Sequence, residues 1–469
     1  MKLTKTGARR GASLATILVA GLGVAGQAHA AAFYLQEQST VAVGRAFSGE
    51  VSEQGAQQQW WNPAAVGGIS GYQSYVGVTA ILPHSNSVNT GTLVGRPGIA
   101  IPGVGAIGSS VSDVGGVQNQ HNPVNNGYLP NGGFAVPISD HLAFGFTATS
   151  PYSFTTNYDN DSWARYSADK TRLRTYDLQP VLAYSTGGLS IGAGPNIEYV
   201  RATFSNYLPD PIPNLSGLPV VGPALGAAGF TGQDGHQYLK GDGWDVGYSL
   251  GFQYHNDKVD IGASYKSKIK HTLKGHLIVD GFTDPVLIAA GANMTVKGAK
   301  AQFTTPWQVN LGMRYHVTPA FTIEGQITRF GWDEFSAINL SSLGTNPDQS
   351  LPEKYKNTFS YALGFDYVLS PMLTVRAGVQ RDLSPVIDGE RDPRVPDGPR
   401  WNFATGASVN LTQHMGIDLA ASYDKIHAEP IDKTTAAFVG TPLQTVILTS
   451  GESKNARALV FSVGGHMSF

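Results

Sequence analysis

The 469-residue sequence contains no cysteine, and only 14% of its residues are charged. Without cysteine, the chain has neither disulfides nor a thiolate zinc site to hold it together. After residue 30, charged residues and glycines interrupt every apolar stretch before it reaches the roughly 20 residues of a transmembrane helix. These absences exclude a disulfide-stapled secreted domain and a bundle of membrane-spanning helices. Glycine (57 residues) and aromatic residues (10%) are abundant instead, and this composition favours a large β-structure.

The first thirty residues have the layout of a secretory signal peptide. Basic residues at positions 2, 5, 9 and 10 precede an apolar run from Ala12 to Ala25, and Ala28-His29-Ala30 provides a small-x-small cleavage site. We therefore expect residues 1–30 to be removed on export. Without the four basic residues of this segment, 28 of the 32 Lys and Arg remain against 34 Asp and Glu. This slightly acidic balance argues against a nucleic-acid partner.

The later two-thirds of the sequence alternates between apolar and polar residues. In Gly243–Tyr254 every even position is apolar, whereas the odd positions hold Gly, Asp, Ser and Gln. A period of two places all the apolar side chains on one face of a β-strand. The same pattern recurs in residues 359–367, 401–411 and 459–469. The sequence thus predicts strands with one apolar face and one small or polar face.

The connections between these strands differ at their two ends. Asn256-Asp257 and Thr318-Pro319 are short turns, whereas Pro83–Gly127 and Ser205–Asp242 are long. Short turns on one rim, long loops on the other and apolar residues outside are typical of a bacterial outer-membrane barrel. The alternative, a soluble β-sandwich, predicts apolar faces inside and turns of similar length at both ends.

We count fourteen candidate strands, an even number as in single-chain bacterial barrels. The expected fold is therefore an all-β transmembrane protein, a 14-stranded antiparallel barrel. The strands are predicted at Ser70–Leu82, Asn126–Ile138, His141–Thr149, Lys170–Thr186, Gly188–Phe204, Gly243–His255, Lys258–Lys274, Val296–His316, Ala320–Phe335, Lys356–Leu369, Met372–Leu383, Arg400–Leu411, His414–His427 and Ala456–Phe469.

Residues 31–69 do not alternate, and they precede the first strand. A barrel of this size encloses more space than its own side chains fill. We therefore predict that residues 31–69 form a hatch, or plug, inside the lumen of the barrel formed by residues 70–469. Trp60 and Trp61 suit this place, because an indole packs against a wall while its N–H meets a polar group. Pro63 after Asn62 fixes a turn there.

A series of motifs runs along the whole mature chain: Ala31–Glu50, with Gly44-Arg45-Ala46 and Ser48-Gly49-Glu50, then Asn62-Pro63-Ala64, Tyr199-Val200-Arg201-Ala202, Trp332-Asp333-Glu334-Phe335, Leu383-Ser384-Pro385-Val386 and Val395-Pro396-Asp397. With this series the sequence resembles the FadL/TodX outer-membrane transporters of long-chain fatty acids and other hydrophobic compounds. The resemblance implies a hatch inside a fourteen-stranded barrel, ligand capture at the outer loops and a pocket beside the start of the hatch, near Phe33 and Leu35. It also implies a sideways exit through the wall near strand three.

Pro151 gives an independent indication of the exit. Proline cannot donate a ladder hydrogen bond and belongs at edges, bulges or strand ends. In a closed wall it either opens the ladder locally or lies just past the strand end in an outer loop. The expected gate and hatch residues are Gly44, Arg45, Trp60, Trp61, Asn62, Pro63, Ala64 and Pro151.

The resemblance also bears on the ligand. Fatty-acid members of the family hold a carboxylate with basic residues, and matching through the motifs places those two positions at Asn206 and Asn339. An amide supplies hydrogen bonds but no charge. Arg201 or Arg329 substitutes for the missing charge if it points inward. Hydrocarbons, aromatics or neutral lipids are therefore as consistent with the sequence as fatty acids.

The predicted function is passive uptake of hydrophobic molecules by a multi-pass protein of the Gram-negative outer membrane. A general porin and an outer-membrane lipid hydrolase are the alternatives, although no spacing singles out a nucleophile and base. We expect no enzymatic activity, no cofactor and no metal, and we interpret the acidic run from Asp388 to Asp397 as a solvated outer loop rather than a calcium site. The expected partners are outer-membrane lipid, lipopolysaccharide and the hydrophobic ligand, with the protein as a monomer.

Overall fold

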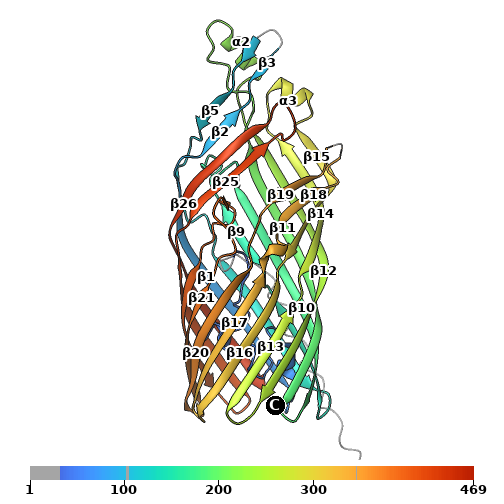
Figure 1. The fold of residues 1–469 in the computed structure, drawn as a ribbon, viewed down its shortest axis with the longest axis vertical. Coiled ribbons are helices and arrows are strands. Elements are labelled where there is room, and N and C mark those ends of the chain that lie inside the picture. Colours follow the sequence, from blue (N-terminus) through green and yellow to red (C-terminus); the bar gives the residue numbers. More distant parts are fainter. Residues whose placement is uncertain (1–31, 102–104, 345) are drawn as a thin grey trace, which may run out of the picture.

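The computed structural model describes residues 32–101, 105–344 and 346–469. Its main sheet is a closed antiparallel barrel, because the first strand, β1 (Gln73–Asn89), pairs with the last, β26 (Thr445–Ser468). Short turns lie at the lower rim, beside the C-terminus, and long extensions rise above the upper rim (Figure 1). The signal peptide predicted for residues 1–30 lies outside the described residues.

The chain crosses the wall fourteen times, which confirms the predicted barrel. Several crossings consist of two consecutive strands. In addition to β1 and β26, the wall strands are β7 (Gly127–Pro137), β8 (Leu142–Thr149) with β9 (Ser153–Asn157), β10 (Lys170–Thr186), β11 (Leu189–Leu208), β12 (Gly235–His255), β13 (Val259–Lys266) with β14 (Ile269–Asp280), β15 (Met294–Thr305) with β16 (Trp307–Thr318), β17 (Phe321–Gly331) with β18 (Ala337–Ser341), β20 (Thr358–Ser370), β21 (Leu373–Asp382), β23 (Arg400–Asn410) and β24 (Met415–Ile426).

Shorter elements cover the upper rim or lie ahead of the wall. The upper ones are β2 (Leu93–Arg96), β3 (Ile99–Ile101), β4 (Gly105–Ile107), β5 (Ser110–Asp113), β6 (Asn119–His121), β19 (Gln349–Pro352), β22 (Glu390–Arg391), β25 (Pro430–Ala437), α2 (Gly222–Ala227) and α3 (Pro285–Ala289). The 3-10 turn η2 (Trp332–Glu334) joins β17 to β18 within one crossing of the wall. Ahead of β1 are α1 (Thr40–Gly44) and the 3-10 turn η1 (Pro63–Val66). None of the described helices is long and apolar enough to cross a bilayer.

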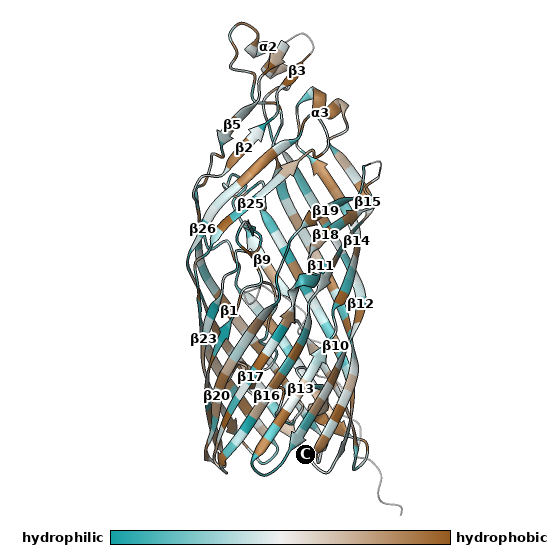
Figure 2. Cartoon of the chain, viewed as in Figure 1, coloured by the Kyte–Doolittle hydropathy of each residue, from teal (hydrophilic) through white to brown (hydrophobic). Residues whose placement is uncertain are grey.

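The wall places its apolar residues outside. Along β12, Trp244, Val246 and Leu250 are exposed, whereas Ser249 and Gln253 are fully buried. Brown apolar positions alternate with teal polar ones along the lower strands (Figure 2). This alternation is that of a membrane barrel, and it excludes the soluble β-sandwich, whose apolar faces would point inward.

The wall strands are longer than the apolar alternation indicates. β11 continues to Leu208 and β12 starts at Gly235, within a stretch expected to be a loop, and the two pair from Leu189↔Tyr254 to Leu208↔Gly235. Above the membrane, both faces of such a ribbon meet water or other loops. The backbone hydrogen bonds of the two strands therefore continue beyond the point where the apolar alternation ends. This alternation was the pattern from which we predicted the strands.

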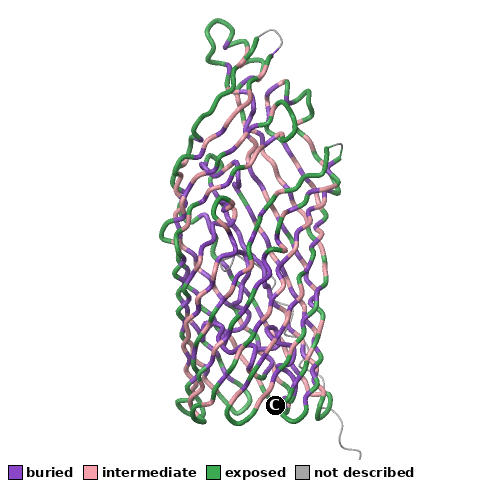
Figure 3. The backbone as a smooth tube through the Cα atoms, in the orientation of Figure 1, coloured by how far each residue is buried: buried purple, intermediate pink, exposed green. Residues whose placement is uncertain are grey.

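Residues 32–69 lie inside the barrel. Their side chains reach wall residues on different sides of the lumen: Tyr34 Oη donates to Gln308 Oε1 on β16 (3.0 Å), and Asn62 Nδ2 donates to the Phe252 carbonyl on β12 (3.0 Å). The hydroxyls of Thr40 and Ser462, on β26, are 2.8 Å apart. The interior of the lower barrel is accordingly buried almost throughout (Figure 3).

Candidate functional site

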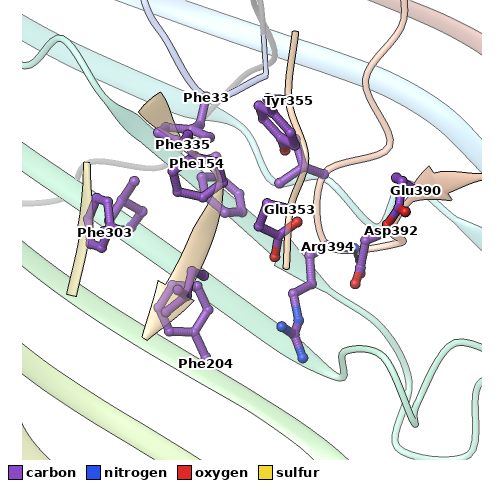
Figure 4. A pocket seen from close by; sticks show the side chains of 13 residues that line it. Phe33, Phe154, Phe204, Phe303, Phe335, Glu353, Tyr355, Glu390, Asp392 and Arg394 are labelled. Atoms are coloured by element: carbon purple, nitrogen blue, oxygen red, sulfur yellow. Dashed lines mark hydrogen bonds between the residues drawn. The ribbon is translucent and has the colours of Figure 1, made fainter. Parts of the chain in front are cut away.

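A largely aromatic cavity lies beside the start of the N-terminal segment. It encloses roughly 500 Å³ of empty space, including its open mouth. Aromatic rings form one side of it, and carboxylates with one guanidinium form the other (Figure 4). The lining residues are Phe33, Phe154, Leu173, Phe204, Phe303, Phe335, Ile338, Glu353, Tyr355, Glu390, Asp392, Arg394 and Val395.

Phe33 is the centre of the aromatic side. Its ring centroid is 5.1 Å from those of Trp332 and Phe335, with edge-on geometry, and 5.8 Å from that of Phe154. Trp332 opens η2, which turns the chain between β17 and β18, and both Trp332 and Phe335, the residue after η2, are buried inside. Edge-to-face packing of this kind contributes about 0.5–1.5 kcal/mol per pair beyond the area buried. The cavity therefore has a rigid apolar lining suited to a hydrophobic ligand.

The polar side of the cavity is largely paired internally. Lys433 Nζ on β25 lies 3.1 Å from Glu353 Oε2 and 3.7 Å from Asp392 Oδ2. Burial raises the pKa of the Glu353 carboxyl above its usual range. Burial also disfavours the charge on Lys433, but Asp392 and Glu353 outweigh this effect and raise the Lys433 pKa. Arg394 donates through Nε to the Ser167 carbonyl (2.9 Å).

The sequence analysis did not identify this polar set. Glu353 and Lys433 stand in long stretches that it assigned to loops, and they are 80 residues apart. Asp392 belongs to the acidic run that it interpreted as a solvated loop, yet Asp392 is buried. Asp397 from the same run is also buried: it accepts hydrogen bonds from the Ala32 N–H (3.0 Å) and the Ser384 hydroxyl (2.6 Å). The two motifs containing Ser384 and Asp397 thus hold the start of the N-terminal segment.

The predicted ligand residues other than Phe33 do not line this cavity. Leu35 is buried nearby, and its N–H donates to the Pro151 carbonyl (2.7 Å). Asn206 is buried but donates to the Tyr166 and Tyr207 carbonyls (3.3 and 3.0 Å). Asn339 is exposed on β18, where its neighbours Ile338 and Leu340 face inward.

The two arginines expected to replace the missing charge lie on the outer face of the wall. Val200 and Ala202 are buried, so the period of two along β11 points Arg201 outward. Arg329 is exposed in the same way on β17, with its guanidinium 5.6 Å from the Trp307 ring centre. Neither reaches the cavity, and Arg394 is its only lining cation among the described residues.

The third crossing of the wall, which consists of β8 and β9, is interrupted at Pro151. β8 ends at Thr149 and β9 starts at Ser153, and both pair with β10. Pro151 therefore lies within the crossing rather than beyond its end. On the other side, β7 pairs with β8 from Gly132 to Pro137 and shows no ladder pairing with β9 in the described chain.

The N-terminal segment pairs with the interruption from inside. Leu35 N–H donates to the Pro151 carbonyl, Ser153 N–H donates to the Phe33 carbonyl (3.0 Å), and Tyr34 stands opposite Tyr152 in an isolated antiparallel bridge. The side chain of Gln38 adds two more bonds to the Ser150 backbone, both of 3.1 Å. The start of the segment thus acts as a short extra strand at the broken crossing.

Arg45 joins the N-terminal segment to the opposite part of the wall. It is fully buried, with Nε 2.6 Å from Glu50 Oε1 and Nη1 3.3 and 3.2 Å from Glu324 on β17 and Asp366 on β20, and it also contacts Glu53. Its neighbour Gly44, at the end of α1, packs against the wall so closely that an added Cβ would lie 2.9 Å from Gly406 Cα.

Trp60 and Trp61 pack edge to face inside the lumen, with ring centres 5.0 Å apart. Trp60 Nε1 donates to Asp177 Oδ2 (3.3 Å), and Lys266 Nζ lies 3.4 Å from the Trp60 ring centre. The indoles thus combine apolar packing with a polar contact, as expected for a tryptophan inside a polar lumen.

Asn62 fixes the turn that follows. Its side chain caps η1 by accepting from the Ala64 N–H (3.0 Å), and Pro63 takes the first position of the turn. Gly192 and Gly251 on the adjacent strands leave room for this turn: a Cβ would lie 2.4 Å from Pro63 C at the first and 1.9 Å from Asn62 Oδ1 at the second. These wall glycines are a signal that the sequence analysis did not use.

Comparison with known proteins agrees with this architecture. The family model described as Outer membrane protein transport protein (OMPP1/FadL/TodX) matches residues 21–469. Similar proteins include a long-chain fatty acid transport protein of Escherichia coli O157:H7, 26% identical over 416 residues that cover 85% of this chain and 88% of the relative. Outer membrane protein P1 of Haemophilus influenzae is 26% identical over 97% of this chain and 98% of its own.

The fold is also that of a solved relative. The crystal structure of a Pseudomonas aeruginosa FadL homologue superposes with a TM-score of 0.78 at 23% identity, covering 94% of this chain and 100% of that chain. The resemblance inferred from the motifs is therefore confirmed. This chain belongs to the OMPP1/FadL/TodX family of outer membrane transport proteins and resides in the outer membrane of a Gram-negative cell.

Proposed function

We propose that this protein carries hydrophobic molecules passively across the outer membrane. Cargo is captured at the outer loops, passes into the aromatic cavity and leaves sideways through the wall at the interrupted third crossing. The family match and the fatty acid transport protein among the relatives support a cargo of long-chain fatty acids, hydrocarbons or aromatics.

One observation carries this proposal: Phe33 belongs to both parts of the route. Its ring lines the cavity, and its carbonyl accepts the hydrogen bond of Ser153 at the interruption. The next residue on β9, Phe154, lines the cavity as well. A cargo that displaces the Phe33 ring therefore acts directly on the backbone pairing at the third crossing.

A sideways exit suits an apolar cargo. Release into the periplasm would expose its apolar surface to water at about 25 cal/mol per Å². Release through the wall into the hydrocarbon layer avoids this cost. The unpaired edge of β7 above Gly132, next to the interruption, is where we place the exit.

Residues 31–69 act as the hatch in this proposal, and residues 70–469 as the barrel. Trp60, Trp61 and the Asn62-Pro63-Ala64 turn fill the lumen, and Gly44 and Arg45 fix the segment to the far wall. A filled lumen favours a carrier of hydrophobic molecules over a general hydrophilic porin. Ion conductance that appears only after residues 31–69 are deleted supports this choice, whereas equal conductance of the intact protein contradicts it.

The cavity charges favour cargo with a neutral head at least as much as a carboxylate. Three carboxylates, Glu353, Glu390 and Asp392, face a single arginine. The nearby Lys433 is already held by two of these carboxylates. We therefore propose that alkanes and aromatics enter the cavity as readily as fatty acids.

The cysteine-free chain allows a direct test of the exit. Tyr34 and Tyr152 lie opposite each other between the two backbone hydrogen bonds described above, and they exchange no backbone hydrogen bond themselves. In such a pair the two Cα atoms are about 4.5 Å apart, which is within the range of a disulfide. In the double variant Tyr34→Cys/Tyr152→Cys, oxidation locks the hatch to the third crossing. We expect uptake of labelled hexadecanoate and hexadecane by expressing cells to stop on oxidation and to return on reduction.

A matched cysteine pair controls for oxidation itself. Leu419→Cys/Val463→Cys joins β24 to β26 on the outer face, away from the hatch. This variant should transport equally in both redox states. Full transport by the oxidised Tyr34→Cys/Tyr152→Cys variant would overturn the exit at the third crossing.

The remaining features of the proposal concern its surroundings. The protein acts as a monomer, in contact with outer-membrane lipid and lipopolysaccharide, without a cofactor and without enzymatic activity. Hydrolysis of a fluorogenic lipid ester by the pure protein, at a rate that survives repurification, would contradict the last point.

A further inference from the structure

Two rows of outward-facing side chains cross five neighbouring strands, from β10 to β15, on one sector of the wall. Cross-strand register makes the residues of each row direct neighbours. The lower row is Arg174, Arg201, Asp242, Lys274 and Lys300, and the upper row is Arg172, Thr203, Lys240, His276 and Lys297. Seven of these ten side chains are Arg or Lys, and only Asp242 is acidic. We call the seven cations the basic patch.

The cations of the basic patch are not held in ion pairs, although Asp242 lies between Arg201 and Lys274 in the lower row. No ion pair within 4.0 Å joins any of its seven side chains to a carboxylate in residues 32–101, 105–344 and 346–469. Arg174 stands directly opposite Arg201, and like charges in such a pair destabilise a sheet. The Nε atoms of Arg172 and Arg174 are also buried without a hydrogen-bond partner. This arrangement is unfavourable unless an external anion binds there.

An aromatic row fixes the depth of the basic patch. Tyr176, Tyr199 and Trp244 are the next outward residues below the lower row, with ring centres 6.3 and 5.1 Å apart. Tyrosine and tryptophan belts mark the boundary between hydrocarbon and headgroups in membrane barrels. Two residues of a strand span about 7 Å. The basic patch therefore starts at the level of the outer-leaflet headgroups.

We propose that the basic patch is a binding site for the phosphate groups of the outer-leaflet glycolipid. Arginine guanidinium groups bind phosphate oxygens through two parallel hydrogen bonds, and the lysines add positive charge on either side. The acyl chains of the same lipid lie along the aromatic row and the apolar wall below it. This site is on the outer face, so it is independent of the cargo cavity and of the proposed transport.

The test is native mass spectrometry of the purified, detergent-extracted protein with added lipid A carrying two phosphates. We expect the double variant Arg174→Gln/Arg201→Gln to bind this lipid at least roughly tenfold more weakly, because both guanidinium groups and their charge-assisted hydrogen bonds to phosphate are lost. Arg174→Lys/Arg201→Lys should lie between this variant and the unchanged protein, since it keeps the charge and loses the paired bonds.

Two further arms identify the ligand and exclude a general charge effect. Dephosphorylated lipid A should bind weakly to the unchanged protein, to the same extent as lipid A binds to the Gln variant. Inorganic phosphate at the same concentration should not displace lipid A from the unchanged protein. Arg329→Gln/Arg381→Gln removes two outward arginines that lie over Trp307 and Trp401 elsewhere on the wall. This control should retain full binding.

The proposal is overturned if the Gln variant, with an unchanged circular dichroism spectrum, retains lipid A, or if the control loses as much. Equal binding of dephosphorylated lipid A would also overturn it, because the acyl chains alone would then account for the contact. Displacement by inorganic phosphate would show a site for the free anion instead.

Discussion

The Ser153 N–H donates to the Phe33 carbonyl at 3.0 Å, so the N-terminal segment is hydrogen-bonded to the strand that follows the break at Pro151. The two residues are 120 positions apart in the sequence. Their pairing connects the cavity, which Phe33 lines, to the wall, to which Ser153 belongs. In the proposed route, cargo binding and wall opening therefore share one backbone contact.

Arg394 should be the group that allows a carboxylate cargo to bind beside the three carboxylates of the cavity. We expect Arg394→Gln to weaken binding of hexadecanoate about tenfold, since a charge-assisted hydrogen bond is worth roughly 1.5–3 kcal/mol, and to leave binding of hexadecane unchanged. Isothermal titration of the pure protein measures both ligands. Arg329→Gln on the outer face is the matched control and should change neither. An unchanged affinity for hexadecanoate in Arg394→Gln would show that the carboxylate stays outside the cavity.

The Arg45 side chain should stabilise the hatch against local opening. Arg45→Met leaves Glu50 buried without its ion-pair partner and Glu324 with Arg314 alone, and removing one partner of a buried pair costs about 3–5 kcal/mol. Faster hydrogen exchange in residues 40–66, with no change in the wall strands, is the expected result. Exchange as slow as in the unchanged protein would mean that Arg314, which also contacts Glu324, suffices alone.

Wall glycines below the Asn62 turn should tolerate no side chain. In Gly251→Ala the new Cβ would lie 1.9 Å from Asn62 Oδ1, so the turn must move, at a cost of about 1–3 kcal/mol. In Gly325→Ala, the Ala362 carbonyl at 3.6 Å is the nearest contact, and this variant serves as the control. We expect a lower thermal midpoint and a more protease-sensitive hatch for Gly251→Ala alone. Equal midpoints for the two variants would contradict the close packing of the turn.

The upper loop after β11 should open more readily as the pH rises. Burial, followed by repulsion from Asp284 and Asp234, raises the pKa of Asp210 to about 7. A carboxyl with a raised pKa stabilises the folded loop fully below its unfolded pKa of about 4, and this contribution is lost as the pH rises through about 7. Hydrogen exchange of residues 209–232, corrected for intrinsic rates, should show more opening at pH 8 than at pH 5.

The variant Asp210→Asn removes the titrating group and keeps its hydrogen bond to the Ile212 N–H within reach. The difference in opening between pH 5 and pH 8 should then largely disappear. A difference of the same size in this variant would assign the effect to another group in the loop.

Much of the barrel could be predicted from the sequence, because the membrane imposes a simple rule on it. Every wall strand must present apolar side chains to lipid, and β12, β20, β23 and β26 show this as an uninterrupted period of two. The strand count follows from the same local signal. The hatch at residues 31–69 and the opening at Pro151 stay predictions, inferred from the lack of alternation before the first strand and from the missing N–H of proline. The upper parts of strands such as β11 and β12 were not predicted, because no lipid faces them and the alternation of apolar residues ends there.

The candidate site depended on signals that are not local. Phe33 was predicted from its place in the chain and Asn206 and Asn339 by motif matching. Arg201 and Arg329 were named as replacements for the missing charge on the condition that they point inward. One residue of offset along a strand moves a side chain from the lumen to the outer face. Arg201 and Arg329 fall on the outer face for this reason. Glu353, Asp392 and Lys433 come from separate loops, and only folding brings them together.

The sequence by itself determined the class of fold, its environment and the order of its strands, because hydrophobic periodicity and turn chemistry act between near neighbours. The tertiary structure alone decided which side chains face the cavity, which cations remain unpaired on the outer wall and how Phe33 reaches Ser153. These depend on the closure of the barrel, which brings residues hundreds of positions apart within hydrogen-bonding distance.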